Sequence, residues 1–134
     1  MNREIKFRGK VVNTNQWVYG NLMVYKKHYP TITWVDDAEL VGNKRTYVVY
    51  PDSVGEWAGL NDKNGQEIYE GDVVLQQGYN GKKMPMAVRF EKGAFIVGYH
   101  KGSSTRKTPM LVSSKCEVID NVFDNPKLEQ SLNK

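Results

Sequence analysis

The sequence is poor in residues that build covalent and metal chemistry: it has one cysteine, Cys116, and two histidines, His28 and His100, among 134 residues. One cysteine excludes an intrachain disulfide framework and a zinc site made of several thiolates. No apolar run approaches the ~18 residues of a membrane span, and the charged start MNREIKFRGK lacks the apolar stretch of a signal peptide. We therefore expect a soluble protein of the cytoplasm with no membrane contact.

The length of the chain favours a single domain over residues 1–134. The chain has 19 Lys and Arg residues against 15 Asp and Glu, a formal charge of +4. This charge is uneven, because residues 51–80 are mainly acidic whereas residues 1–50 and 81–134 are mainly basic. Such an order would steer an anionic polymer to one side of the fold or match a second copy head to tail, and the sequence leaves both open.

Composition and periodicity indicate β-structure. Aromatic residues make up 11% of the chain, and 12 glycines punctuate short runs rich in Val, Ile and Tyr. Near the start, apolar or small residues alternate with basic ones, the period of two that a half-buried strand shows. The apolar set is Ile5, Phe7, Gly9 and Val11, and the basic set is Lys6, Arg8 and Lys10. This pattern predicts one buried face and one exposed row of positive charge.

Further strands and turns follow from local signals. We expect strands at residues 17–25, 31–35, 47–50, 72–77, 86–90 and 94–99, turns at 13–16, 78–83 and 91–93, and a loop at 36–45. Asn64-Gly65 predicts a type I′ hairpin turn, whose two central residues need positive φ. Residues 101–109 are polar and basic and predict a mobile loop, and residues 116–123 form a last apolar run.

Asn125 and Pro126 are typical of a helix start, with Asn at the N-cap and Pro at the first helical position, and predict a helix to about Leu132. The predicted fold class is all-β: a small barrel or SH3-like meander of short strands with a short C-terminal helix.

Motifs for metal or phosphate chemistry do not fit. Counted from Asp62, an EF-hand loop would need Gly at position 6 and Glu at position 12, where the sequence has Glu67 and Val73. The stretch 78–83 lacks the glycine spacing and the Ser or Thr of a phosphate-binding loop. Both segments are typical of hairpin turns, so we expect no metal and no cofactor.

Candidates for catalysis have simpler structural interpretations. Cys116 would need His28 or His100 as a base, whereas its alternating apolar run favours a small buried side chain. The carboxylates of Asp62, Glu67, Glu70 and Asp72 fit either paired acid–base groups or solvated hairpin faces, and the second interpretation is favoured. The sequence therefore predicts a protein that is not an enzyme.

Three blocks of the sequence resemble the YopX family. Residues 3–9, REIKFRG, are similar to its N-terminal signature. Residues 58–74, AGLNDKNGQEIYEGDVV, resemble its central motif, with Ala58 in place of Thr and Asn61 in place of Lys. Residues 116–128, CEVIDNVFDNPKL, resemble its C-terminal ending, with Asp120 in place of Gly. The blocks stand in the family's order and bracket nearly the whole chain.

The resemblance implies a barrel-like β-domain encoded by a bacteriophage or prophage of Gram-positive bacteria, acting in the host cytoplasm and forming homo-oligomers. It implies no known activity and no catalytic residues. We therefore predict a non-enzymatic, oligomeric protein-interaction module, with a second copy or a phage or host protein as its partner. Unpaired edge strands give such a protein a physical route to self-association.

Weak, sequence-independent nucleic-acid binding is the alternative function. The candidate residues are Lys6, Arg8, Lys10, Lys82, Lys83, Arg106 and Lys107, because phosphate binding needs clustered cations. Trp17, Trp34 and Trp57 are candidates for stacking on bases or sugars, although tryptophans in a small β-protein are more often part of the core. A modest net charge and the acidic central segment argue against this alternative.

Overall fold

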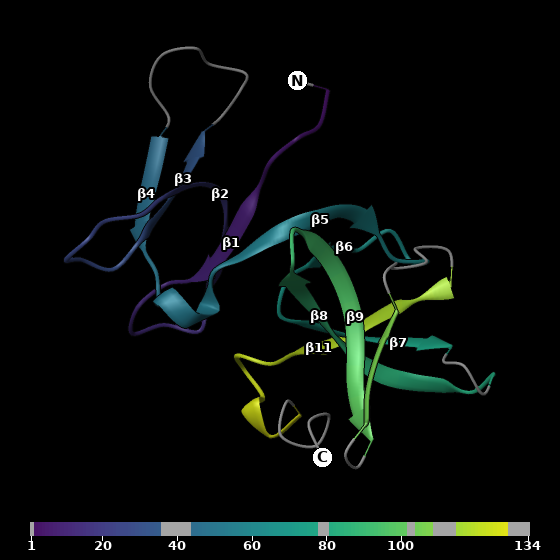
Figure 1. Ribbon diagram of the computed structural model, residues 1–134. Coiled ribbons are helices and arrows are strands. Elements are labelled where there is room, and N and C mark those ends of the chain that lie inside the picture. The colour runs from purple at the N-terminus through teal and green to yellow at the C-terminus, as the bar shows by residue number, and fades with distance from the viewer. Residues whose placement is uncertain (1, 36–43, 78–80, 102–103, 109–114, 129–134) are drawn as a thin grey trace. The chain divides into compact units, whose positions relative to one another are not determined.

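The computed structural model describes residues 2–35, 44–77, 81–101, 104–108 and 115–128, with the backbone alone for residues 35, 99–101 and 104–108. Antiparallel strands dominate it (Figure 1). One sheet has the order β4-β3-β2-β1-β5-β6 and the other β10-β9-β8-β7-β11. The strands are β1 (Phe7–Lys10), β2 (Trp17–Met23), β3 (Thr31–Val35), β4 (Lys44–Val48), β5 (Gly55–Asn61), β6 (Glu67–Tyr69), β7 (Asp72–Gln77), β8 (Lys83–Glu91), β9 (Ala94–Lys101), β10 (Ser104–Thr108) and β11 (Glu117–Asn121).

The all-β prediction is confirmed, but the predicted barrel is wrong, because both sheets stay open. A barrel needs its first and last strands to pair, and among the described residues β4 does not pair with β6, nor β10 with β11. One hydrophobic cluster contains Val18, Ile32 and Val49. Another contains Ile68, Val74, Met86, Val88, Val97 and Cys116.

The chain divides into two compact units, Met1–Trp57 and Ala58–Lys134, called here the N-terminal and C-terminal units. The start of β5 pairs with β1, and η1 (Pro51–Ser53) precedes it. Each unit is described by itself. The expectation of one folding domain stays a prediction.

In the N-terminal unit, β1 and β2 form the predicted hairpin around residues 13–16. The Val11 N–H donates to the Gln16 carbonyl at 2.9 Å, and Asn13 has a φ of 62°. Gly20 in β2 allows a close approach of β3: a Cβ built there would lie 2.2 Å from the carbonyl oxygen of Thr33. Glycine is therefore required where β2 and β3 meet.

In the C-terminal unit, β7, β8 and β9 form the predicted meander, and β7 has the predicted bounds. A turn with positive φ at both central residues joins β8 to β9, at Lys92 (52°) and Gly93 (81°). The type I′ prediction for Asn64-Gly65 is wrong, because only Gly65 has positive φ. There the Asp62 side chain accepts the Asn64 N–H, and the Gly65 N–H donates to the Asp62 carbonyl.

Two further predictions concern the C-terminal third. The loop predicted at 101–109 contains β10, which pairs with β9 through main-chain hydrogen bonds that polar residues form as well as apolar ones. A helical turn covers residues 126–128, with the Leu128 N–H donating to the Asn125 carbonyl. The predicted loop at 36–45 is wrong at residues 44 and 45, because β4 begins at Lys44 rather than at the predicted residue 47. Residues 36–43 of that loop, residues 78–80 of the predicted turn and the predicted helix extension to Leu132 lie outside the described residues. Within the described part of the chain, no helix has both the length and the hydropathy for a membrane span.

Candidate functional site

The first candidate surface is a cation–aromatic row on one face of the N-terminal unit, formed by Lys6, Arg8, Lys10, Trp17 and Trp57. The register places Lys10 opposite Trp17 and Arg8 opposite Tyr19. The Arg8 guanidinium carbon lies 4.7 Å from the Trp17 ring centroid, and Lys10 Nζ lies 5.8 Å from it. Lys6 Nζ lies 5.0 Å from the Trp57 ring centroid. Each cation of the row therefore faces an indole ring, a favourable arrangement.

The prediction that this row is fully exposed is wrong for Arg8, which is buried with 8% of its surface accessible. The cause is the neighbouring strand, since Trp17 is the diagonal neighbour of Arg8 and its ring reaches the guanidinium. Lys6 keeps 24% of its side chain exposed and lies 4.0 Å from Glu4. The row is thus a packed cation–aromatic layer rather than a solvated line of charge.

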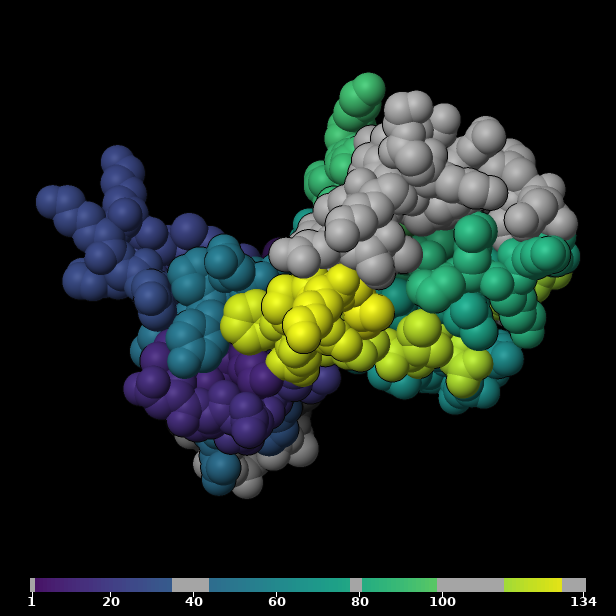
Figure 2. All heavy atoms as spheres, turned by 90° about the horizontal axis from the view of Figure 1, so that it is seen from below, coloured from purple at the N-terminus to yellow at the C-terminus, as the bar shows by residue number. Residues whose placement is uncertain are grey.

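The second candidate surface is an apolar patch on the same sheet, defined by Met23, Val24, Tyr25, Tyr29 and Val48. Pairing aligns Met23 with Thr31 and Thr31 with Val48, so these side chains lie side by side across β2, β3 and β4. Met23 is 57% exposed and Val48 49%. Val24, Tyr25 and Tyr29 come from the loop between β2 and β3, which projects from this unit (Figure 2).

A hollow lies within the apolar patch. It has a volume of about 400 Å³ and is lined by Tyr25, His28, Tyr29, Thr31 and Val48. The Tyr25 and His28 rings meet edge to face at 6.5 Å, and the hydroxyls of Tyr25 and Thr31 lie 3.3 Å apart. These contacts hold the loop over the sheet end, so the patch combines exposed aromatic and aliphatic groups around a concave centre.

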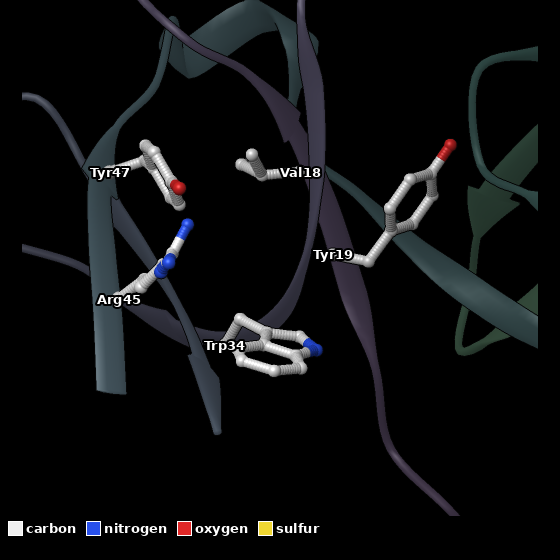
Figure 3. Close-up of a pocket in the computed structure, with 5 residues that line it drawn as sticks. All are labelled: Val18, Tyr19, Trp34, Arg45 and Tyr47. Carbon is white, nitrogen blue, oxygen red and sulfur yellow. The ribbon is translucent and has the colours of Figure 1, made fainter. Parts of the chain in front are cut away.

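The third candidate is a pocket of about 300 Å³ lined by Val18, Tyr19, Trp34, Arg45 and Tyr47. Figure 3 shows Val18, Trp34, Arg45 and Tyr47 around a common space, with the Tyr19 ring directed away from it. Trp34 is 45% exposed, so the interpretation of this tryptophan as a core residue is wrong. The reason is its place near the end of β3, beyond the hydrophobic cluster around Ile32.

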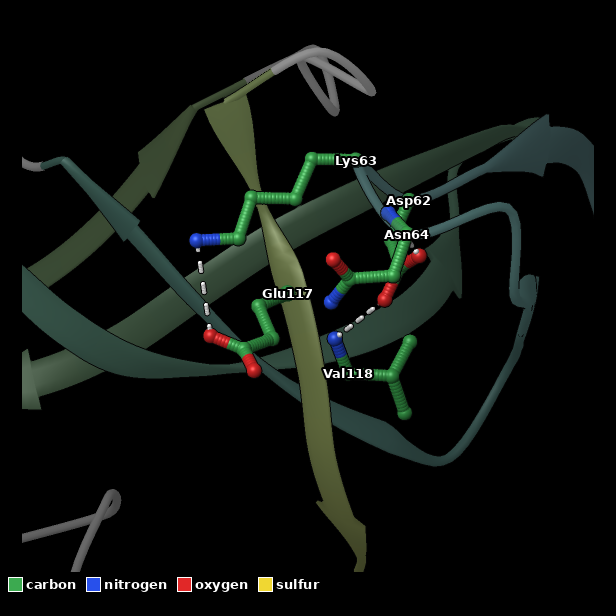
Figure 4. Close-up of polar contacts among 5 residues, drawn as sticks. All are labelled: Asp62, Lys63, Asn64, Glu117 and Val118. Atoms are coloured by element: carbon green, nitrogen blue, oxygen red, sulfur yellow. Dashed lines mark hydrogen bonds and ion pairs between the residues drawn. The ribbon is translucent and has the colours of Figure 1, made fainter.

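The carboxylates of Asp62 and Asp72 accept hydrogen bonds from backbone N–H groups. Asp62 Oδ1 accepts the N–H groups of Asn64 at 2.8 Å and Gln66 at 2.9 Å, and its Oδ2 accepts the Val118 N–H at 2.9 Å (Figure 4). Burial alone would raise the pKa of Asp62, but these donors and Lys63 outweigh it and lower the pKa. Asp72 is buried and its Oδ2 accepts the Tyr69 N–H at 2.8 Å. Both carboxylates thus fix turns.

Cys116 lies in the hydrophobic cluster of the C-terminal unit and is fully buried. Burial and, next, the charge of Asp62 raise the pKa of its thiol. A raised pKa disfavours the thiolate, which is the nucleophilic form. Among the described residues, no group of three or more His, Cys, Asp or Glu side chains has a metal-binding arrangement.

Comparison with known proteins identifies the family. The profile of the family described as YopX protein matches residues 6–129. The chain belongs to the YopX family. A crystal structure of protein EF1440 from Enterococcus faecalis resembles this YopX protein with a TM-score of 0.51 and 18% identity, over 95% of this chain and 99% of that chain. This likeness concerns the fold. The search of curated proteins finds no match.

The structure gives the central motif of this YopX protein a folding role. Asp62 ties the turn of residues 62–66 to β11 through Val118, and the Lys63 N–H donates to the Cys116 carbonyl at 3.1 Å. The motif and the C-terminal block, which are far apart in sequence, are therefore neighbours. Spacing alone carries no signal for this pairing.

The seven predicted nucleic-acid residues are divided between the two units. Lys6, Arg8 and Lys10 belong to the N-terminal unit. Lys83, the first residue of β8, and Lys82 just before it are exposed in the C-terminal unit. Arg106 and Lys107 belong to β10, where the structure describes the backbone alone. Their role in nucleic-acid binding stays a prediction.

Proposed function

We propose that this YopX protein is a non-enzymatic, homo-oligomeric protein-interaction module of a phage or prophage, acting in the bacterial cytoplasm. The observation that carries the proposal is the apolar patch of the N-terminal unit. Its exposed Met, Val and Tyr side chains are contiguous, unlike the scattered apolar residues of an ordinary surface. Contiguous exposed apolar surface is typical of protein-binding sites.

A second copy of the chain is the partner we favour. The patch residues carry no formal charge, so two patches facing each other would desolvate no ion. Exposed Lys26 and Lys27 adjoin Tyr25 in the chain and fit the polar rim that surrounds such interfaces. Symmetric contacts of one patch with itself are the commonest way to form a dimer.

The non-enzymatic part of the proposal is supported by the roles of the candidate groups. Asp62 and Asp72 bind backbone N–H groups in turns, and Cys116 is buried with a raised thiol pKa. Groups engaged in this way are poor acids, bases or nucleophiles, because catalysis needs them at a pocket in reach of substrate.

The test is light scattering of the wild type and two matched variants. Val48→Lys places a charge in the patch, and Ile119→Lys places the same charge on β11, where the exposure is similar: 49% for Val48 and 46% for Ile119. We expect assemblies larger than 15.3 kDa for the wild type and Ile119→Lys, and a shift toward monomer for Val48→Lys. A monomeric wild type at micromolar concentrations and above would contradict the proposal.

Nucleic-acid binding by the cation–aromatic row is the second candidate function. The observation in its favour is that Lys6 lies over the Trp57 ring and Lys10 over the Trp17 ring, with the 42% exposed Tyr19 beside Trp17 on the same face of β2. Exposed aromatic rings beside cations stack bases and contact phosphates.

The test for this second function is a titration of fluorescent single- and double-stranded oligonucleotides at low and moderate salt. We compare the wild type with the double variant Lys6→Glu, Lys10→Glu and with the control Lys115→Glu, Lys127→Glu, which has the same net charge. Loss of binding in the first variant alone is expected. Equal binding by both variants would remove the row as a nucleic-acid surface.

A further inference from the structure

The pocket of the N-terminal unit is built on the sheet face opposite the apolar patch. Register pairs Trp34 with Arg45 and Ile32 with Tyr47, and alternate residues of a strand share a face. Trp34, Arg45 and Tyr47 therefore lie on the face of buried Ile32, whereas Thr31 and Val48 lie on the other face. The pocket is thus separate from the apolar patch.

Part of the pocket wall packs on the hydrophobic cluster of the N-terminal unit. Buried Val18 forms part of the hydrophobic cluster, and Tyr47 packs against that cluster. On the opposite face, the hydroxyls of Thr33 and Thr46 lie 2.9 Å apart and join β3 to β4 next to the Trp34 and Arg45 pair. Trp34, Arg45 and Tyr47 border an open volume of about 300 Å³.

The chemistry of the lining defines its ligand. Trp34 is 45% exposed, and Tyr47 faces the same space (Figure 3), so flat apolar surfaces are available for a planar group. Among the described residues that line the pocket, Arg45 is the charged one, and its planar guanidinium suits a phosphate. The volume lies at the lower end of the ~300–1,000 Å³ typical of small-molecule sites. A planar ring joined to an anion meets these requirements.

We propose that this pocket binds one nucleotide, with the base on Trp34 and Tyr47 and the phosphate on Arg45. The ligand is a free nucleotide or one residue of a single strand, because both present a base next to a phosphate. The proposal does not rest on the protein-interaction function, since the two surfaces are on opposite faces of the sheet. It also differs from the cation–aromatic row, which uses Lys6 and Lys10.

NMR of the indole N–H signals tests the proposal, because Trp17, Trp34 and Trp57 give one signal each. The probes are adenosine 5′-monophosphate, adenosine and a short oligodeoxyadenylate. For an open pocket we expect a dissociation constant for the monophosphate on the order of 1 mM, which a titration to about 5 mM covers. We expect the Trp34 signal to move most with the monophosphate and less with adenosine.

Four variants separate the contributions of the charge and of the ring. Arg45→Gln should weaken monophosphate binding roughly tenfold and leave adenosine binding unchanged. Lys44→Gln removes the same charge from the adjacent residue, which points to the other face, and should leave both unchanged. Trp34→Ala should remove the binding of both ligands, and Trp34→Phe should retain part of it if the alanine variant is poorly folded.

If the pocket binds the oligonucleotide much more tightly than the monophosphate, its ligand is a single strand. If the two affinities are equal, its ligand is a free nucleotide. The proposal is overturned if no probe moves the Trp34 signal. It is also overturned if Arg45→Gln and Lys44→Gln change the binding equally.

Discussion

Replacement of Asp62 is the sharpest test of the folding role given to the central motif. Its carboxylate accepts three backbone N–H groups, and the residue has 6% of its surface exposed. Asn at this position can keep one oxygen for Asn64 and Gln66, but it turns an NH₂ group toward the Val118 N–H. We expect Asp62→Asn to lower the free energy of unfolding by about 2 kcal/mol, since a buried donor is left without its acceptor.

Asp62→Ala removes all three acceptor contacts and should cost roughly 3–5 kcal/mol, within the range for breaking a buried polar network. The control is Lys63→Ala in the same turn. Lys63 Nζ lies 3.6 Å from Glu117, and both side chains are about 40% exposed, so its loss should cost about 0.5 kcal/mol or less. We therefore expect Asp62→Ala to be the most destabilising variant, Asp62→Asn the next and Lys63→Ala the least.

Labelling of Cys116 with a thiol reagent during urea titration is the suitable assay. Cys116 is buried in the C-terminal unit, whereas all three tryptophans belong to the N-terminal unit. Tryptophan fluorescence would therefore report unfolding of the N-terminal unit, whereas Asp62 belongs to the C-terminal unit. If Asp62→Asn and Lys63→Ala shift the Cys116 labelling midpoint by equal amounts, the carboxylate does not hold the turn and the reasoning fails.

The remaining predictions concern pH, the thiol, a glycine and the domain count. The lowered pKa of Asp62 means that its stabilisation is present above the unfolded value of about 3.9 and is lost as pH falls through the folded value, so acid should destabilise the wild type more than Asp62→Asn in urea titrations. Cys116 should react with thiol reagents only after opening, because its thiol is buried and has a raised pKa; prompt labelling of the folded protein would contradict this. Gly20→Ala should lower the stability of the N-terminal unit by about 1–3 kcal/mol, measured by tryptophan fluorescence, because its Cβ would meet the Thr33 carbonyl oxygen; an unchanged midpoint would refute the close approach. A single folding domain predicts coincident urea transitions by tryptophan fluorescence and Cys116 labelling, and separated transitions would show two domains.

Local signals predicted most of the strands. Residues 31–35 and 72–77 match β3 and β7, because alternation and β-branched residues are properties of the segment itself. β10 was missed because its sequence STRKT has no apolar alternation, and its order comes from pairing with β9. Asn64-Gly65 closes a hairpin as predicted, but the Asp62 side chain selects a different turn type. The existence of β10 therefore depends on pairing with β9, and the turn type at Asn64-Gly65 depends on a side-chain contact, and local sequence patterns predicted neither.

The candidate surfaces were less predictable than the strands. Alternation correctly placed Lys6, Arg8 and Lys10 on one face, but burial of Arg8 depends on the ring of Trp17 in the next strand. Register determines the pocket, since Trp34 and Arg45 are opposite each other in β3 and β4. The apolar patch likewise needs three strands in register, and the sequence pattern of any one strand does not reveal it.

Cross-linking at Met23 tests the protein-interaction proposal most directly. Met23→Cys puts a thiol in the exposed apolar patch, Ile119→Cys puts one at a site of comparable exposure outside it, and native Cys116 stays buried. A short bis-maleimide applied at micromolar protein concentration should give a covalent dimer for Met23→Cys in much higher yield than for Ile119→Cys. Equal yields for the two variants would contradict self-association through the patch.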